Sequence, residues 1–282
     1  MNRTMASSEL TPTGYIQHHL TNLKLQVGEG GFWVLHLDTL ITSVFVGLFM
    51  CFAFWLATRR ATAGVPGRWQ AFVEMVLEFV DQQCKDSYQG TSRLVTPIAI
   101  TLFCWILLLN AFKFIPADFL AIPLGMAAVA LAELFGAADP SKFNYWKPVP
   151  TTDMSATLGM SFSVFFLMIF FALRAKGFGG FIHELFTAPF GKWLFPANLL
   201  LNFVELLSKP ISLAMRLFGN MYGGELVFLL IWVLGSAGIA GMLAGGTFGL
   251  GWMLFHLLVV PLQAFIFMML SIVYLGLMEE HH

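Results

Sequence analysis

The sequence predicts an all-α polytopic membrane protein, because it is rich in apolar residues and contains long stretches without charge. Of its 282 residues, 58% are hydrophobic and 11% are charged, and the mean hydropathy is +0.77. A soluble protein carries about 25% charged residues, so a soluble core does not fit this composition. A membrane-spanning helix needs about 20 mainly apolar residues. Residues 39–58, 94–112 and 154–173 meet that need without a single charge.

Composition and motifs also exclude several classes of function. The formal net charge of −1 argues against a nucleic-acid partner. Cys51, Cys84 and Cys104 are too widely spaced for a disulfide framework or a metal-binding knuckle. No nucleotide-binding motif is found, since the glycines of 246–251 lack the required spacing. We therefore expect no metal and no cofactor.

Lysine and arginine counts predict the orientation in the membrane. Segments 59–93 and 174–192 carry five and three of these residues, against two in residues 1–37 and three in 113–153. The positive-inside rule then places the former pair of segments in the cytoplasm. Residues 1–31 lack the continuous apolar run of a signal peptide, which favours a bacterial inner membrane with the first helix as insertion signal.

The predicted order of segments follows from these observations. It comprises a periplasmic segment 1–38, a transmembrane helix 39–58, a cytoplasmic loop 59–93 with an amphipathic helix, a transmembrane helix 94–112, a periplasmic loop 113–153, a transmembrane helix 154–173, a cytoplasmic loop 174–194, a tilted helical hairpin 195–278 and a cytoplasmic tail 279–282.

The connecting loops carry weaker signals. Within 59–93, apolar residues from Trp69 to Val80 share one helical face opposite an acidic one, which predicts a surface helix that packs against protein. The uncharged run 119–132 is too short to span the membrane. Residues 139–150 are expected to form an exposed, aromatic-rich loop, and no function is assigned to loop 135–148.

The C-terminal third predicts two long helices, 195–234 and 252–278, joined by a glycine-rich connection at 235–251. At about 1.5 Å per residue, such helices exceed the ~30 Å of hydrocarbon, so we expect a steeply tilted hairpin. The glycines of the connection, Gly241 and Gly245 among them, are interpreted as turn or close-packing residues.

Polar residues form a stripe along the first of these helices. At about 100° per residue, seven of them fall within roughly 80° of one another. They are Asn198, Asn202, Glu205, Lys209, Ser212, Arg216 and Asn220. On the second helix, His256, Gln263 and Tyr274 share one face. Both stripes predict an aqueous path or a polar seam.

Arg216 is the member of the stripe whose position most requires a functional explanation, because a charge inside lipid costs at least ~2.5 kcal/mol. Simpler interpretations exist for the others: a solvated helix face for the stripe, a satisfied core histidine for His256, an interhelical hydrogen bond for Gln263 and an interfacial position for Asp118. An ion-coupled secondary transporter and a non-conducting membrane scaffold are alternative functions. No internal repeat supports the transporter, and the scaffold leaves the aligned polar residues unexplained.

Two blocks of sequence resemble a known family. Residues 208–226, SKPISLAMRLFGNMYGGEL, and residues 255–275, which contain FH and PLQAFIFMMLSIVYL, resemble the signature of subunit a of F-type ATP synthases. The similarity extends more loosely through residues 174–180, 196–198 and 32–38, and so covers most of the chain.

The resemblance implies a stationary proton-channel subunit of the Fo motor, not catalytic by itself, which works beside a rotating ring of c subunits. Subunit b of the peripheral stalk and the remaining ATP synthase subunits are the other implied partners, together with the lipid bilayer. Proton flow would drive ring rotation and ATP synthesis.

Residue roles are implied in the same way. Arg216 matches the essential arginine that separates two offset half-channels. Asn220, Glu225, His256 and Gln263 match the periplasmic route, and Ser212 and Tyr274 match positions near the cytoplasmic exit.

The chain departs from the family pattern at two positions. Asn202 stands where relatives often carry an acid, and Glu205 on the same stripe is hypothesised to take over that exit role. Lys113 stands where some relatives carry an acid, which leaves Asp118 as the carboxylate nearest the inlet. His256 and Glu225 favour H⁺ over Na⁺ as the coupling ion, because both side chains can relay protons.

Overall fold

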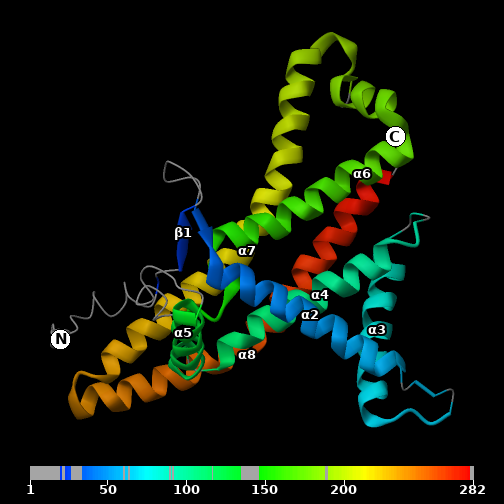
Figure 1. Cartoon of the computed structure of the whole chain (residues 1–282). Coiled ribbons are helices and arrows are strands. Elements are labelled where there is room, and N and C mark those ends of the chain that lie inside the picture. Colours follow the sequence, from blue (N-terminus) through cyan, green and yellow to red (C-terminus); the bar gives the residue numbers. More distant parts are fainter. Residues whose placement is uncertain are drawn as a thin grey trace. The chain divides into compact units, whose positions relative to one another are not determined.

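The computed structural model describes residues 20, 23–26, 34–59, 61–62, 64–88, 90, 92–115, 117–134, 146–187 and 190–279. For residues 117–122, 131–132, 134 and 192 it describes the backbone alone. The helices are α2 (Leu37–Arg59), α3 (Arg68–Ser87), α4 (Val95–Ala111), α5 (Ala117–Leu134), α6 (Met154–Thr187), α7 (Phe195–Gly235) and α8 (Gly238–Glu279) (Figure 1). Short 3₁₀ turns lie at Phe112–Phe114, Pro150–Thr152 and Lys192–Leu194.

Five of the helices are long and apolar enough to cross a membrane: α2, α4 with its 3₁₀ extension, α6, α7 and α8. The chain is therefore an all-α polytopic membrane protein, as its composition predicts. Helix α5 covers the short run 119–132 and is not among the five.

Two helices extend further than the sequence predicts. The prediction of a connection at 235–251 is wrong, because α8 already begins at Gly238. From Gly238 onward, the glycines of this segment belong to helix α8, where they allow α7 and α8 to approach each other closely. Helix α6 continues beyond residue 173, and a second helical part follows Gly177 and ends at Thr187. The chain turns at Gly177, whose φ of 71° is a conformation that side chains other than glycine's rarely adopt.

The chain divides into two compact units. Unit 1 comprises residues 1–45, 109–153 and 220–259, and unit 2 comprises residues 46–108, 154–219 and 260–282. Four helices, namely α2, α4, α7 and α8, contribute residues to both units.

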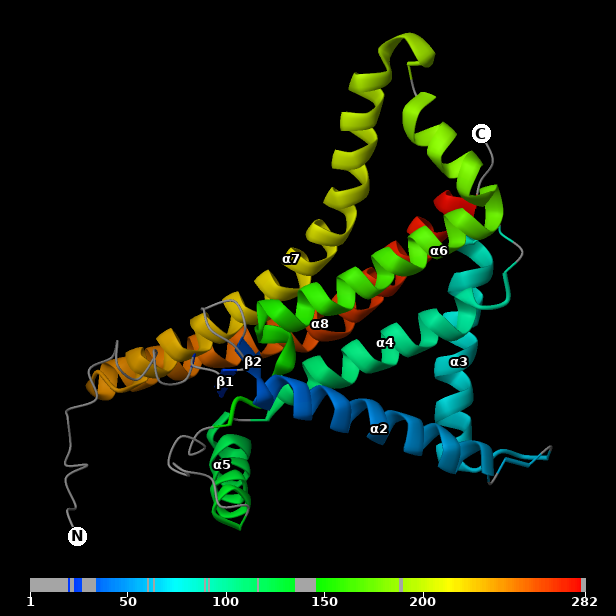
Figure 2. The same cartoon turned by 45° about the horizontal axis from the view of Figure 1, so that its top comes forward.

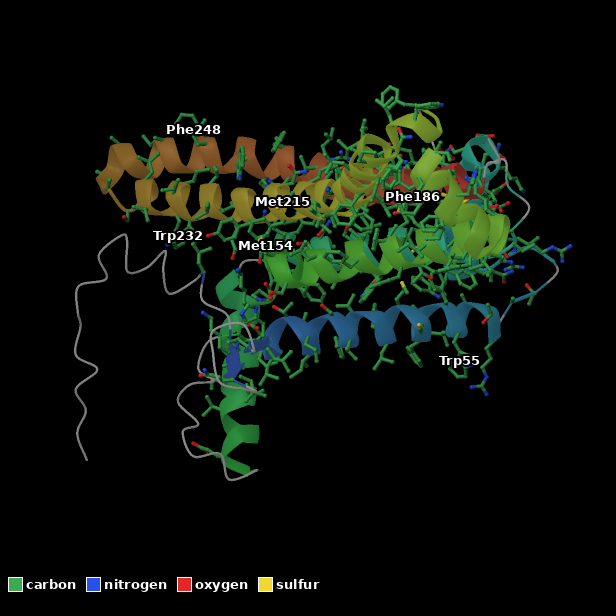
Figure 3. The ribbon with its side chains drawn as sticks, turned by 90° about the horizontal axis from the view of Figure 1, so that it is seen from above. Trp55, Met154, Phe186, Met215, Trp232 and Phe248 are labelled. Carbon is green, nitrogen blue, oxygen red and sulfur yellow. The ribbon has the colours of Figure 1, made fainter. Side chains whose placement is uncertain are left out.

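Unit 1 contains the closed end of the α7–α8 hairpin, where the two helices run antiparallel and side by side (Figures 1 and 2). A side chain at Gly245 would lie 2.9 Å from the Cα atom of Gly235. Glycine at this position therefore sets the close approach of the two helices. Large apolar side chains cover the outside of the hairpin, and Figure 3 shows Trp232 and Phe248 projecting from it; these are 66% and 63% exposed.

The N-terminal part of unit 1 is a two-stranded antiparallel sheet. Strand β1 (Lys24–Gln26) pairs with β2 (Val34–His36), with Leu25 opposite Leu35. Asp38 is buried at the start of α2, where its carboxylate accepts hydrogen bonds from the backbone N–H groups of Leu23 and Thr39. His36 contacts Asp153 at 2.5 Å. Segments far apart in sequence are thus tied together by polar contacts.

In unit 2, helix α3 runs across the direction of α2 and α4 (Figure 2). It buries Val73, Val80 and Cys84, which confirms the predicted amphipathic helix. Just after α3, the Tyr88 hydroxyl donates to Glu279 at the end of α8. Burial, followed by this contact, raises the pKa of Tyr88 to about 12, so the phenol keeps its proton.

Helix α7 contains Pro210, which removes one backbone hydrogen bond from the helix. The hydroxyl of Ser161 on α6 donates to the Pro210 carbonyl, so that α6 and α7 are joined at this point. Ser161 and its neighbours Val164, Met168 and Phe171 are buried within unit 2.

The glycine contact predicts a stability effect. We expect Gly245→Ala to destabilise the hairpin by about 1–3 kcal/mol, as for other overpacked sites, despite the gain of up to ~1 kcal/mol in helix propensity. Thermal unfolding of the detergent-solubilised protein, followed by circular dichroism, measures the change. Gly246→Ala is the matched control, because no atom lies within 4 Å of a side chain there. Equal unfolding midpoints for the two variants would contradict the packing role.

Candidate functional site

A cluster of buried polar side chains surrounds Glu225 in unit 1. The Nζ atom of Lys147 lies 3.7 Å from the Glu225 Oε2 atom, and Lys147 is 3% exposed. The same ammonium group lies 5.8 Å from the centre of the Tyr222 ring. A charged lysine is almost never buried without a partner, so Glu225 and Tyr222 account for its position.

Lys147 corrects one sequence prediction. Residues 139–150 were expected to be an exposed loop, whereas Trp146, Lys147 and Val149 are buried. The Trp146 indole donates to the Thr42 hydroxyl at 3.0 Å, which ties the segment to α2. Residues 135–145, and with them most of the loop 135–148 without an assigned function, lie outside the described part of the chain.

Lys113 belongs to the same unit. Its Nζ atom donates a hydrogen bond of 2.6 Å to the carbonyl of Met221, one turn before Glu225 on α7. Gly224 leaves the space that Lys113 needs, because a side chain at Gly224 would collide with Lys113 Nζ and with His256 Nε2. The Lys113 ammonium group and the His256 imidazole therefore both lie close to the α7 backbone at Gly224.

His256 is buried on α8 and surrounded by aromatic rings, with Trp252 and Phe228 at 5.0 and 5.2 Å between ring centres. Its Nδ1 atom lies 3.1 Å from the Trp252 carbonyl. Because a carbonyl only accepts hydrogen bonds, we assign the ring hydrogen to Nδ1. In the neutral ring Nε2 is then a proton acceptor, and it has no hydrogen-bond partner among the described residues.

Of the residues predicted for the periplasmic route, Glu225 and His256 both lie at this cluster. Asn220 is exposed, and Asp118 lies in the first turn of α5, with its side chain outside the described residues. No pattern in the sequence indicates a role for Lys147 or for Asn110, which is buried and whose side-chain oxygen accepts a hydrogen bond of 2.7 Å from Thr151.

Arg216 lies in unit 2, half-buried on α7. Its neighbours along the helix, Leu213, Ala214 and Leu217, are buried, whereas Met215 is 44% exposed. Among the residues that the structure describes, none forms a hydrogen bond or an ion pair with Arg216. The guanidinium group is therefore a cation in an apolar helix whose counter-charge is not found within the described chain.

A cavity of about 330 Å³ lies in unit 2 between parts of α6, α7 and α8. Its polar lining residues are Lys176, Glu184, Asn202, Glu205 and Lys209, and its apolar lining includes Leu206 and Leu277. A space of this size holds several water molecules.

Two ion pairs stand at the cavity. Lys176 Nζ lies 2.7 Å from both carboxylate oxygens of Glu184, and Lys209 Nζ lies 2.9 Å from Glu205. Lys176 and Glu184 flank the turn at Gly177, so the pair bridges the two parts of α6. No spacing rule in the sequence indicates this pair, because the turn alone brings the two residues together.

Two of the residues predicted for the cytoplasmic route line the cavity, namely Asn202 and Glu205. The Asn202 amide donates to the Leu185 carbonyl at 3.0 Å. Tyr274 is connected to the same region, since the Lys209 ammonium lies 5.9 Å from the centre of its ring. Ser212 is exposed on α7, and Gln263 is buried on α8.

Asn198, the first member of the polar stripe, serves the local fold. Its amide donates to the carbonyls of Phe186 and Gly191, and its oxygen accepts from the N–H of Phe190. These bonds anchor the connection before α7.

Comparisons with known proteins identify relatives of the chain. A family model described as "ATP synthase A chain" matches residues 40–276. The chain is 49% identical to ATP synthase subunit a of Alkalilimnicola ehrlichii, over 96% of this chain and 97% of the relative. It is 49% identical to subunit a of Pseudoalteromonas atlantica and 45% identical to that of Halorhodospira halophila, each over 98% of this chain and 99% of the relative.

These matches confirm the resemblance found in the two sequence blocks. The chain therefore belongs to the ATP synthase subunit a family.

Proposed function

We propose that the chain is the stationary proton-channel subunit of the Fo motor of a bacterial ATP synthase. It works beside a rotating ring of c subunits, is held by subunit b and the other synthase subunits, and does not catalyse a reaction alone. The observation that carries this proposal is Arg216, a cation on an apolar helix with no partner among the described residues. A ring of carboxylate-bearing subunits supplies the missing counter-charge.

An arginine suits this position because its guanidinium group keeps its charge where a lysine would release a proton. At about 4 Å and an effective dielectric constant near 20, it attracts a carboxylate by about 4 kcal/mol. A protonated ring carboxyl that approaches Arg216 therefore releases its proton and passes as an anion. The fixed charge also repels a proton that would cross directly between the half-channels.

The periplasmic half-channel would use Glu225 and His256 as proton carriers, with Asn220, Gln263 and Asp118 along the route. Support comes from the unit 1 cluster, where His256 presents a nitrogen without a hydrogen-bond partner among the described residues. Asn220 and Gln263 do not titrate and serve as hydrogen-bonding groups for water.

The cytoplasmic half-channel would use Ser212, Asn202, Glu205 and Tyr274. Support comes from the unit 2 cavity, whose lining contains Asn202 and Glu205. Glu205 supplies the titratable carboxylate, since the Asn202 amide is not ionisable. Each charge that moves through 100 mV releases about 2.3 kcal/mol, and this work biases the rotation.

The orientation completes the proposal. The chain is a multi-pass protein of the bacterial inner membrane, with the N-terminus in the periplasm and the C-terminus in the cytoplasm. Arg59 and Arg174 support it, because both cations lie on predicted cytoplasmic segments directly after an apolar stretch. The hairpin of α7 and α8 is tilted, because helices of 41 and 42 residues exceed the ~30 Å of hydrocarbon.

Arg216→Lys tests the central assignment. We expect ATP-driven proton pumping to fall to background, because lysine can lose its proton and no longer separates the half-channels. Dye quenching in inverted membrane vesicles measures pumping, and co-purification of the c ring shows that the complex is assembled. Coupled pumping at the normal rate in an assembled Arg216→Lys complex contradicts the proposed function.

Glu205→Gln tests the exit. We expect proton flux to fall about 10-fold or more, since a positioned proton-transfer group contributes 10²–10⁴-fold in other proteins. Passive proton flux through the membrane sector, measured against pH on the cytoplasmic side, reports the change. Glu78→Gln is the control, because Glu78 is an exposed residue of α3. If both variants show the same flux and pH profile, Glu205 is a surface residue without a role in the exit.

Gly224→Ala tests the geometry of the inlet. The added methyl group would displace the amine of Lys113 and the ring of His256, so we expect a loss of proton pumping of about 10-fold or more. Gly223→Ala is the adjacent control, because no atom lies within 4 Å of a side chain at that position. Equal pumping by the two variants would show that the contact at Gly224 is unimportant.

A further inference from the structure

Two lysine ammonium groups lie near the carboxylate of Glu225, which is the carboxylate of the unit 1 cluster among the described residues. Lys147 lies 3.7 Å from Glu225, and Lys113 donates to the Met221 carbonyl one turn earlier on α7. We propose that Lys113 and Lys147 form a charge filter that keeps metal cations such as Na⁺ away from Glu225 and His256. The inference rests on the proposed function, and it assigns the ion selectivity of the inlet to two residues.

The first argument is electrostatic. A metal cation at Glu225 would stay a separate charge, close to the ammonium group that already lies 3.7 Å from the carboxylate. Two like charges about 4 Å apart, at an effective dielectric constant near 20, disfavour joint occupancy roughly 1,000-fold. Water screens these groups little, because Lys147 is 3% exposed.

The second argument concerns oxygen ligands. Sodium sites in membrane helices are built from carbonyl and carboxylate oxygens. Around this cluster, the carbonyls of Met221, Gly224 and Trp252 accept hydrogen bonds from Lys113, from the Trp252 indole and from the imidazole of His256, respectively. Side-chain donors thus occupy the carbonyls that a cation would need.

The lysines repel a proton as well, but a proton forms a covalent bond to nitrogen or oxygen, which a metal cation does not. The proton becomes part of an imidazole or a carboxyl group and needs no shell of oxygen ligands. His256 Nε2 has no hydrogen-bond partner among the described residues and is the acceptor of the neutral ring. The cluster therefore lets a proton bind and opposes a metal ion.

The test uses the assembled ATP synthase in proteoliposomes. ATP-driven acidification and uptake of radioactive Na⁺ are measured while NaCl replaces choline chloride at constant ionic strength. For the native complex we expect no Na⁺ uptake and no effect of NaCl on proton pumping. In Lys113→Met and Lys147→Met we expect NaCl to inhibit the remaining proton pumping at least about 10-fold, at concentrations that leave the native complex unaffected.

Two control variants accompany these measurements. Lys113→Arg keeps the charge and should stay insensitive to NaCl. Lys24→Met removes an exposed lysine of strand β1 and should behave like the native protein.

Na⁺ uptake by the native complex, or NaCl-insensitive pumping in both methionine variants, overturns the filter. If one methionine variant does not assemble, the other decides, and the native measurement decides in every case. If the filter is wrong and the proposed function is right, proton pumping still depends on Arg216. If the proposed function is wrong, the Arg216→Lys complex shows coupled pumping.

Discussion

The high free energy of a charge in an apolar environment is the constraint on which this protein depends. The structure satisfies it by pairing: Lys147 contacts Glu225, Lys176 contacts Glu184, and Lys209 contacts Glu205. Arg216 has no such partner among the described residues, although Leu213, Ala214 and Leu217 beside it are buried. In the proposed function its counter-charge arrives on another chain, so this part of α7 is complete only in the assembled motor.

The two polar regions differ in how they are built. In unit 1, donors and carbonyls are bonded to one another around a single glycine, which leaves room for a proton but little room for another ion. In unit 2, ion pairs line a cavity of about 330 Å³ that is large enough for water. A relay between side chains suits the first region, and hydrated transfer suits the second.

The long apolar helices could be predicted because hydropathy and the absence of charge act locally along the chain. The long hairpin was predicted for the same reason, whereas its turn was placed wrongly. Glycines such as Gly245 suggested a connection, and only the approach to Gly235 shows that they belong to the helix. Tertiary contacts of this kind are not visible in one sequence.

The site was predictable in part. Glu225 and His256 were identified by resemblance and meet in one cluster, and Glu205 lies in the cavity beside Asn202. Lys147 was missed, because a lysine among prolines and aromatic residues is typical of an exposed loop. Its burial depends on partners more than 70 residues away in the chain, such as Glu225. The pair of Lys176 and Glu184 was missed as well, because it depends on the turn at Gly177.

Pro210 gives the unit 2 cavity an acceptor of a different kind. An α-helical N–H bonds to the carbonyl four residues earlier, so a proline at 210 leaves the Leu206 oxygen without that bond. Leu206 lines the cavity, beside Glu205 and Lys209. A peptide oxygen neither gains nor loses a proton near neutral pH, so it can bind water equally well whether Glu205 is charged or neutral. One missing bond in the helix ladder thus leaves, on a residue that lines the cavity, a hydrogen-bond acceptor whose charge does not depend on pH.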